Sequence, residues 1–222
     1  MIVIPAIIPH TKEQLESEIK KVKNFCELIQ IDITDGVFVP TKTWPFNGRD
    51  ADYWEKIKGE EEGWPYWLDV EVELHLMIKN PEETLVEWIK TGVTCIVAHI
   101  ESTDDFQGVI DICRENSVDV GLAIKPSTDI SRIENFVSQT DFIQVMGSDM
   151  LGKHNVELDD KAIVMIKKLR ATYPESIIAI DIGVDEDTAE ILVDAGVDKF
   201  VSGGFILDSN DPGGAFENLS SF

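Results

Sequence analysis

The chain has 222 residues, 43% of them hydrophobic, and carries a formal net charge of −23 at pH 7. This length fits one well-packed domain, and we expect a single domain over residues 1–222. So acidic a chain is not expected to bind nucleic acid or an anionic membrane, and it contains no apolar run of the roughly 18 residues that cross a bilayer.

Short runs rich in β-branched residues alternate along the chain with amphipathic runs of helical period. The expected strands are residues 2–8, 27–33, 68–77, 95–100, 119–124, 142–146, 177–181 and 199–201. The expected helices are residues 13–24, 51–58, 81–88, 106–116, 130–138, 159–172, 186–195 and 213–220. Thr11 is a candidate N-cap for the first helix, and Pro81 fits the first turn of the third.

Eight strand–helix units in this order predict an α/β fold. Their strands are continuously apolar, which is typical of a parallel sheet covered by helices. In a chain of this size, eight such units favour a closed (β/α)8 barrel of the TIM type. An open doubly wound sheet is the alternative, but no Gly-x-Gly-x-x-Gly motif follows the first strand.

The cysteines and the start of the chain indicate its compartment. Cys26, Cys95 and Cys113 show no C-x-x-C spacing and are typical of small buried residues in a reducing environment. The apolar first residues lack a basic leader and predict a first strand, so we expect a cytoplasmic protein. Four tryptophans between Trp44 and Trp67 are expected to cover the barrel mouth or an interface.

Three ionisable side chains, Asp32, His75 and Asp181, stand in apolar segments close to the expected carboxyl ends of strands. An ionisable group in an apolar strand is costly unless it is paired or bound to a metal. The carboxyl ends of the strands form the catalytic face of a (β/α)8 barrel, so we expect the three side chains to converge there. Two carboxylates and an imidazole could hold a divalent cation, and the two carboxylates could pass a proton between the faces of a substrate.

Residues 30–40 read Q-I-D-I-T-D-G-V-F-V-P, which resembles the second-strand signature H-x-D-x-M-D-G-x-F-x-P of the ribulose-phosphate 3-epimerase family. Further segments resemble the same family in the same order, at residues 73–77, 80–82, 98–101, 121–126, 180–183 and 201–204. The match runs over nearly the whole chain, and its order is far more specific than any single motif. The resemblance implies a barrel of the ribulose-phosphate-binding type.

By position, the resemblance implies that Asp32 and Asp181 are the two acid/base residues of an epimerase. It also implies a divalent metal ion, which the family binds through both aspartates and two histidines. One histidine corresponds to His75 and the other to Gln30, whose amide oxygen is a poorer donor to zinc or iron than imidazole. We therefore expect a weakly bound metal, and the candidates are Zn, Fe, Mn and Mg.

The resemblance further implies which residues contact substrate and phosphate. These are Met77, Met146, Gly183, Gly203, Gly204 and Lys153. The phosphate side departs from the family, because residues 149–154 replace N-P-G-F-G-G, whose glycines let backbone N–H groups converge on an anion. Asp149 adds a repelling charge that Lys153 or His154 could compensate, and Ile182 replaces another glycine. We expect reduced affinity for ribulose 5-phosphate.

Two classes of function follow from these residues. The first is an epimerase of ribulose 5-phosphate and xylulose 5-phosphate, or of a related ketose phosphate, by two-aspartate proton transfer through a metal-stabilised enediolate. The intact pair of Asp32 and Asp181 favours it. The second is a non-catalytic, epimerase-like barrel acting as a binding or assembly protein, which Gln30 and the altered phosphate turns favour. A lyase or decarboxylase is disfavoured, because no Asp-x-Lys-x-x-Asp array ends a strand. We expect a small sugar phosphate as the partner, and a homo-oligomer.

Overall fold

The structure is a computed structural model that describes residues 1–153 and 156–222. Within these ranges the strands are β1 (Ile2–Ile7), β2 (Leu28–Thr34), β3 (Glu71–Met77), β4 (Cys95–His99), β5 (Asp119–Ile124), β6 (Phe142–Met146), β7 (Ile178–Asp181) and β8 (Lys199–Ser202). Each strand pairs in parallel with the next, and β8 pairs with β1 to close a barrel. The predicted (β/α)8 barrel is confirmed, with strand ends that differ from the expected ones by a few residues.

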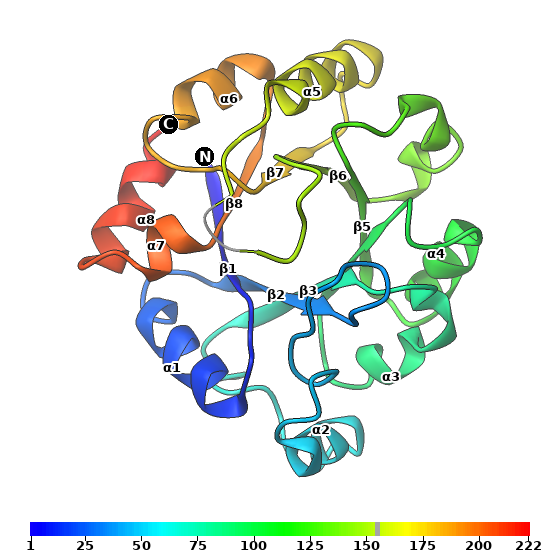
Figure 1. Cartoon of the computed structure of the whole chain (residues 1–222), viewed down its shortest axis with the longest axis vertical. Coiled ribbons are helices and arrows are strands. Elements are labelled where there is room, and N and C mark those ends of the chain that lie inside the picture. The colour runs from blue at the N-terminus through cyan, green and yellow to red at the C-terminus, as the bar shows by residue number, and fades with distance from the viewer. Residues whose placement is uncertain (154–155) are drawn as a thin grey trace.

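Helices surround the barrel in the view down its axis (Figure 1). They are α1 (Lys12–Val22), α2 (Ala51–Lys58), α3 (Leu85–Ile89), α4 (Phe106–Glu115), α5 (Asp160–Thr172), α6 (Ala189–Ala195), α7 (Gly204–Leu207) and α8 (Pro212–Ser220). Short 3-10 turns are η1 (Pro81–Glu83), η2 (Ile130–Arg132) and η3 (Val137–Gln139). No helix in the described part of the chain has the length and apolar character that a membrane crossing requires.

The first helix illustrates how local sequence determines an element. The Thr11 hydroxyl accepts a hydrogen bond from the Gln14 backbone N–H, as expected of an N-cap. Leu15, Ile19 and Val22 recur at helical spacing and are fully buried. This apolar stripe belongs to the main hydrophobic core, which lies between the strands and the surrounding helices. It therefore fixes α1 against the barrel wall.

Residues 130–138 form the 3-10 turns η2 and η3 and not the expected helix. The apolar residues of this segment keep helical spacing toward the core, namely Ile130, Ile133 and Val137. The Asp129 carboxylate accepts the Ser131 N–H, and this local bond closes a turn tighter than an α-helical one. The same spacing suits both helix types over so short a span, so the sequence pattern did not distinguish them.

Two helices near the end of the chain also differ from expectation. Helix α6 begins at Ala189, because the Asp185 carboxylate accepts the N–H groups of Asp187 and Thr188 and holds them in a turn. No helix is expected between residues 201 and 213, whereas the structure has the short helix α7 there. Glycine is a poor helix former, so local propensity gives little sign of this helix.

The aromatic residues after β2 pack beside α2, which lies outside the barrel between α1 and α3 (Figure 1). Trp44 and Trp64 are almost wholly buried, and the Trp44 ring stacks on Tyr53 at 5.5 Å and meets Trp64 edge-on at 5.9 Å. The Trp54 ring lies 4.5 Å from that of Trp88. The rings of this cluster fill the space around α2 and do not cover the barrel mouth, whereas the alternative expectation of an interface stays a prediction.

A separate apolar cluster lies at the carboxyl end of the barrel. Its buried members are Val39, Met77, Met146 and Leu151, with Phe38 and Ile182 packed against them. The cluster joins the connection after β2 to the connection after β6. Gly152, with φ +68°, lets the two connections meet closely, since a Cβ there would lie 2.5 Å from Thr41 Oγ1. These two connections therefore cover one side of the barrel mouth.

Strand register brings polar side chains into the interior of the barrel. Asp32 of β2 pairs with His75 of β3, and Gln30 pairs with Glu73 one step earlier. Across the barrel, Met146 of β6 pairs with Asp181 of β7. Because inward-facing residues alternate along a strand, these pairs form layers across the interior.

Candidate functional site

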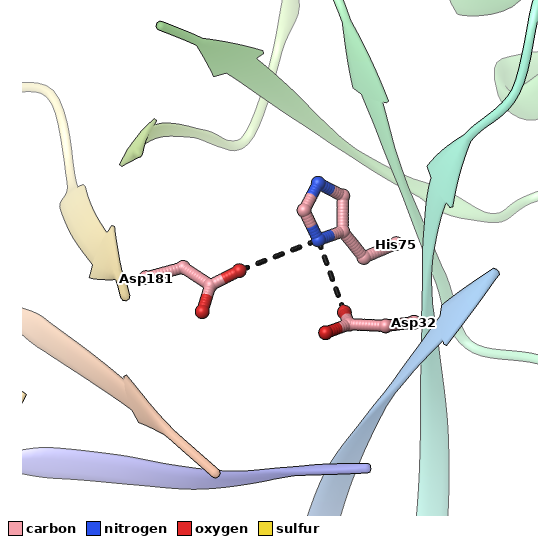
Figure 2. Close-up of side chains that lie close together, drawn as sticks. All are labelled: Asp32, His75 and Asp181. Carbon is pink, nitrogen blue, oxygen red and sulfur yellow. Dashed lines mark hydrogen bonds and ion pairs between the residues drawn. The ribbon is translucent and has the colours of Figure 1, made fainter. Parts of the chain in front are cut away.

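Asp32, His75 and Asp181 converge inside the barrel from β2, β3 and β7 (Figure 2). His75 Nδ1 lies 3.1 Å from Asp32 Oδ1 and 3.4 Å from Asp181 Oδ2. One ligand atom from each residue lies within 4.8 Å of the other two. The two carboxylate side chains each keep 8% of their surface exposed, while the imidazole keeps none. The site thus places two carboxylates toward solvent and one ring nitrogen behind them.

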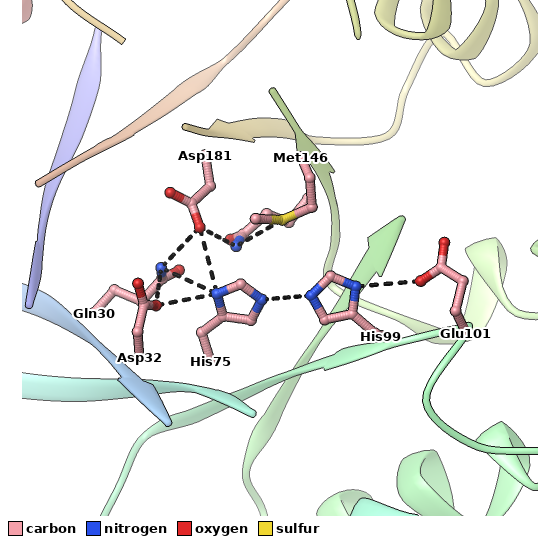
Figure 3. Close-up of polar contacts among 8 residues, drawn as sticks. Gln30, Asp32, His75, His99, Glu101, Met146 and Asp181 are labelled. Atoms are coloured by element: carbon pink, nitrogen blue, oxygen red, sulfur yellow. Dashed lines mark hydrogen bonds and ion pairs between the residues drawn. The ribbon is translucent and has the colours of Figure 1, made fainter. Parts of the chain in front are cut away.

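Gln30 contributes its side-chain amide nitrogen to the same cluster. Nε2 donates to Asp32 Oδ1 at 2.9 Å and to Asp181 Oδ2 at 3.3 Å, and lies 3.5 Å from His75 Nδ1 (Figure 3). The two amide N–H groups are directed at the two carboxylates, so they point where a cation would be attracted. The amide oxygen is buried and finds no hydrogen-bond partner among the described residues.

Gln144 of β6 is a member of this cluster that was not predicted from the sequence. Its fully buried amide donates to Asp181 Oδ2 at 3.3 Å and lies 4.0 Å from the sulfur of Met146. Its amide oxygen likewise has no hydrogen-bond partner within the described ranges. A polar residue between Ile143 and Val145 was the available signal, the same signal that singled out the aspartates. Asp181 is therefore held by amide donors from both Gln30 and Gln144.

The buried charges change each other's proton affinity. Burial is the largest influence on Asp32 and raises the pKa of its carboxyl, although hydrogen bonding to His75 opposes the shift. Burial works against the charged form of His75, but hydrogen bonds to Asp181 and Asp32 outweigh it and raise the pKa of the imidazole to about 9. At neutral pH, His75 is therefore an imidazolium facing two carboxyl groups.

A chain of hydrogen bonds leads from His75 away from the aspartates (Figure 3). His75 Nε2 lies 2.9 Å from His99 Nε2, and His99 Nδ1 lies 3.2 Å from Glu101 Oε2. Burial, together with the charge of His75, lowers the pKa of His99 to about 4. Burial opposes ionisation of Glu101, but hydrogen bonds from His99 and Thr128 lower its pKa to about 2. Neutral His99 therefore lies between a charged imidazole and a charged carboxylate.

A cavity of about 440 Å³ opens from the carboxyl end of the barrel onto this cluster. Eight of the predicted site residues line it, namely Asp32, Met77, Met146, Lys153, Asp181, Gly183, Gly203 and Gly204. The remaining two, His75 and Gln30, contact the aspartates from behind. We call the part formed by Asp32 and Asp181 the inner end. The part formed by residues 182–185 and 203–208 is the outer end.

The backbone at the outer end keeps a conformation that suits glycine. Ile182 has φ +82° and Gly183 has φ +71°. Such a positive φ is strained for a β-branched residue, whereas glycine adopts it freely. A Cβ on Gly183 would lie 2.7 Å from the backbone nitrogen of Leu158, so this position has room only for glycine. The turn after β7 therefore has a glycine-type geometry with an isoleucine at the position where the resemblance implies glycine.

The outer end also carries negative charge. Asp185 and Asp208 line the cavity together with Lys153. Asp149 does not line it, and its carboxylate instead accepts the backbone N–H and hydroxyl of Ser127. The position of Asp149 does not support the expected repulsion of an anion by this residue, and Asp185 and Asp208 supply the negative charge of this wall. His154, the other candidate for compensation, lies outside the described residues. Lys153 is the cation that the described part of this wall supplies.

The inner cluster suits a divalent metal ion by its donor chemistry. Two carboxylates and an imidazole nitrogen lie within reach of one ion, and the partnerless amide oxygen of Gln30 would be a fourth ligand after the amide turns over. An oxygen-rich set with one nitrogen suits Mg, Mn or Fe at least as well as Zn, which favours nitrogen and sulfur. The amide N–H groups of Gln30 compete for the same atoms, which is consistent with weak binding.

Comparison with known sequences gives a consistent result over the chain. The sequence model of the ribulose-phosphate 3-epimerase family matches residues 2–207. A ribulose-phosphate 3-epimerase of Mycobacterium bovis is 26% identical over 221 residues, covering 98% of this chain and 91% of that protein. One of Bacillus subtilis is 26% identical over 215 residues, covering 94% of this chain and 93% of that protein.

Comparison with solved structures supports the fold. The crystal structure of a 3-hexulose-6-phosphate synthase from Salmonella typhimurium matches with a TM-score of 0.70. The match covers 100% of this chain and 97% of that one at 19% sequence identity. At this identity the likeness is one of architecture, a closed barrel of eight parallel strands with helices around it.

Proposed function

The chain belongs to the ribulose-phosphate 3-epimerase family, and on that premise we propose that it interconverts ribulose 5-phosphate and xylulose 5-phosphate or a closely related pair of ketose phosphates. The observation that carries the proposal is the pairing of Asp32 and Asp181 at the inner end of the cavity. They come from β2 and β7, and both line the space that a substrate would enter.

Epimerisation next to a ketone requires a weakly acidic C–H proton to leave one face of a carbon and return to the other. One carboxylate takes the proton and the second donates one from the opposite face. Burial raises the pKa of Asp32, which favours a group that spends part of the cycle protonated. The amide donors of Gln30 and Gln144 hold Asp181 from behind and fix the direction of its oxygens.

Negative charge collects on the carbonyl oxygen as the proton leaves. The imidazolium of His75 contributes positive charge behind the two carboxyl groups and offsets their mutual repulsion. Asp32, His75, Asp181 and the side-chain oxygen of Gln30 would hold a divalent metal ion in place of the Nδ1 proton of His75, and the ion would supply a Lewis acid for the developing oxyanion. Backbone N–H groups of Gly183, Gly203 and Gly204 would receive the phosphate, with Lys153 nearby.

A second candidate function is non-catalytic binding or assembly by an epimerase-like barrel. Two observations favour it. The Gln30 amide donates to the two carboxylate oxygens that would receive a metal, and Asp185 with Asp208 places negative charge where a phosphate would lie. A sugar without phosphate is a further possible ligand on the same grounds. The expected homo-oligomer stays a prediction, which the mass of the protein in solution would test.

Conversion of ribulose 5-phosphate to xylulose 5-phosphate, followed by NMR with and without added Mn²⁺, tests the proposal. We expect conversion that Mn²⁺ accelerates. A parallel series with ketoses that lack phosphate decides the substrate class, since tight binding of such a ketose without competition by phosphate would point to a changed substrate. Failure to turn over any ketose phosphate, even with added metal, would support the non-catalytic alternative.

A further inference from the structure

A buried chain of hydrogen bonds connects the inner cluster to the side of the barrel away from the cavity. It runs from His75 Nε2 to His99 Nε2 at 2.9 Å and from His99 Nδ1 to Glu101 Oε2 at 3.2 Å (Figure 3). Both imidazoles are fully buried, and their rings stack at 5.0 Å with an angle of 25°. Phe38 covers the His99 ring at 5.1 Å. Because both rings are buried, water does not replace their hydrogen-bond partners.

Glu101 sets the direction of this chain. Its Oε1 accepts the backbone N–H of Lys125 at 2.9 Å and the Thr128 hydroxyl, while Oε2 faces His99. A carboxylate only accepts hydrogen bonds, so the proton between Glu101 and His99 must lie on His99 Nδ1. In the neutral ring the other nitrogen, Nε2, is then an acceptor. His99 consequently accepts a hydrogen bond from His75 Nε2–H.

The proton positions in this chain also determine the role of each His75 nitrogen. With its Nε2 committed as a donor to His99, the ring atom that faces Asp32 and Asp181 is Nδ1. This nitrogen is the one available to ligate a metal or to share a proton with the carboxylates. The opposite tautomer would place an N–H against the metal position and leave two acceptor nitrogens facing each other at 2.9 Å.

We propose that Glu101 and His99 are positioning residues, which fix the tautomer and ring orientation of His75 so that its Nδ1 serves the two aspartates. This inference rests on the proposed function in one respect, namely that His75 takes part in the site. Neither Glu101 nor His99 is assigned contact with substrate. Groups that hold a ligating histidine through its second nitrogen typically change metal affinity about 10- to 100-fold when replaced.

Glu101→Gln tests the proposal with little change in shape. The Lys125 N–H must still be accepted, so the amide oxygen takes that side and the NH₂ group faces His99 Nδ1. This reverses every hydrogen bond in the chain. His99 then carries its proton on Nε2, and His75 carries its proton on Nδ1. Above pH 9, where His75 is neutral, we expect ¹H–¹⁵N spectra of the metal-free protein to show this exchange on both rings, and at neutral pH we expect Mn²⁺ affinity to fall about 10- to 100-fold.

Glu82→Gln is a matched control. Glu82 is a half-buried glutamate that accepts a hydrogen bond from Thr103 at 2.8 Å and has no contact with the two histidines. The substitution removes one carboxylate charge, as Glu101→Gln does. We expect unchanged His99 nitrogen signals and an Mn²⁺ affinity within about twofold of the parent protein. A purely structural role for Glu101 would lower the melting temperature without exchanging the proton positions.

Retention of the proton on His99 Nδ1 in Glu101→Gln would overturn the proposal. So would an Mn²⁺ affinity equal to that of the parent and of Glu82→Gln. If the parent itself neither binds Mn²⁺ nor epimerises a ketose phosphate, the proposed function fails. The nitrogen spectra still decide the positioning role in that case, because exchange of the proton positions supports it and retention contradicts it.

Discussion

At the inner end of the cavity, Asp32 and Asp181 are held by donors on every buried side, from Gln30, Gln144 and His75. The outer end shows the reverse, with Ile182 in a backbone conformation that suits glycine and two carboxylates in the wall. The two carboxylates proposed to move a proton are therefore closely held, whereas the end proposed to anchor a phosphate departs from the family pattern. The residues that carry out the reaction and the residues that bind the substrate need not change together in one site.

The largest effect on activity should come from substituting the two carboxylates of the inner end. Asp32→Asn and Asp181→Asn should each lower kcat by about 10²- to 10⁴-fold, because each face of the enediolate needs its own proton carrier. One of them should still exchange a substrate proton with solvent without inverting the centre. Steady-state rates and proton exchange by NMR check this, with metal content measured for each variant.

Asp194→Asn, which alters an exposed carboxylate on α6, is the control for these two variants. It should leave kcat unchanged. Undiminished epimerisation by either metal-loaded inner-end variant would contradict the two-aspartate mechanism.

The next largest effect should be a pH dependence of the unfolding free energy that comes from His75 at the inner end. The folded state raises the pKa of His75 from 6.5 to about 9, so the folded protein binds its proton more tightly than the unfolded chain. The resulting stabilisation, on the order of 3 kcal/mol, is fully present below pH 6.5 and is lost as the pH rises to about 9. Urea unfolding of the metal-free protein at several pH values, compared with His75→Gln, measures it.

The difference in unfolding free energy between parent and His75→Gln should shrink across that pH window. A difference that stays constant from pH 6.5 to pH 9 would mean that His75 is not held as an imidazolium by the two aspartates.

Gln30→His should strengthen the inner end. An imidazole in place of the amide should raise Zn²⁺ affinity by about 10- to 100-fold, since it is the better donor and removes the competing N–H groups. Gln30→Leu separates these causes, because it removes the amide without adding a ligand. Isothermal titration with Zn²⁺ gives the order. Tight, chelator-resistant metal in the unmodified protein would contradict the expected weak binding.

The smallest effect should come from repairing the outer end. Ile182→Gly should lower KM for ribulose 5-phosphate by about 2- to 10-fold, the worth of roughly one recovered hydrogen bond, while kcat changes little. Glycine adopts the positive φ of this position without strain and removes the side chain that lines the cavity beside the neighbouring N–H group. Ile182→Val keeps the β-branched side chain and should leave KM unchanged. An equal KM in all three proteins would show that this turn does not contact the phosphate.

Much of the inner end could be predicted from the sequence, because charged residues in apolar strands are rare enough to stand out. Asp32, His75 and Asp181 carry that signal, and the barrel register brings them together. Gln144 carries a weaker form of it, as a neutral amide in an apolar strand. Whether these residues act as acids, bases or ligands stays a prediction that the variants above address.

Other features depend on geometry that local sequence does not encode. The contact of His75 with His99 requires the register of β3 against β4 and the tilt of both strands. The positive φ of Ile182 follows from the closure of the turn after β7 and contradicts the ordinary preference of isoleucine. The burial of Trp44 and Trp64 around α2 was missed for a similar reason, because aromatic content shows burial but not which layer of the barrel is filled.

Deuterium incorporation from heavy water into ribulose 5-phosphate tests the central claim most directly, because it reports proton transfer at one carbon. With the unmodified protein and added Mn²⁺, we predict deuterium at carbon 3, with xylulose 5-phosphate forming alongside and no label at carbon 1. Asp194→Asn should behave in the same way, whereas at least one of Asp32→Asn and Asp181→Asn should give no label at all. Epimerisation without deuterium exchange, or no exchange in the unmodified protein under any metal condition, would contradict the account.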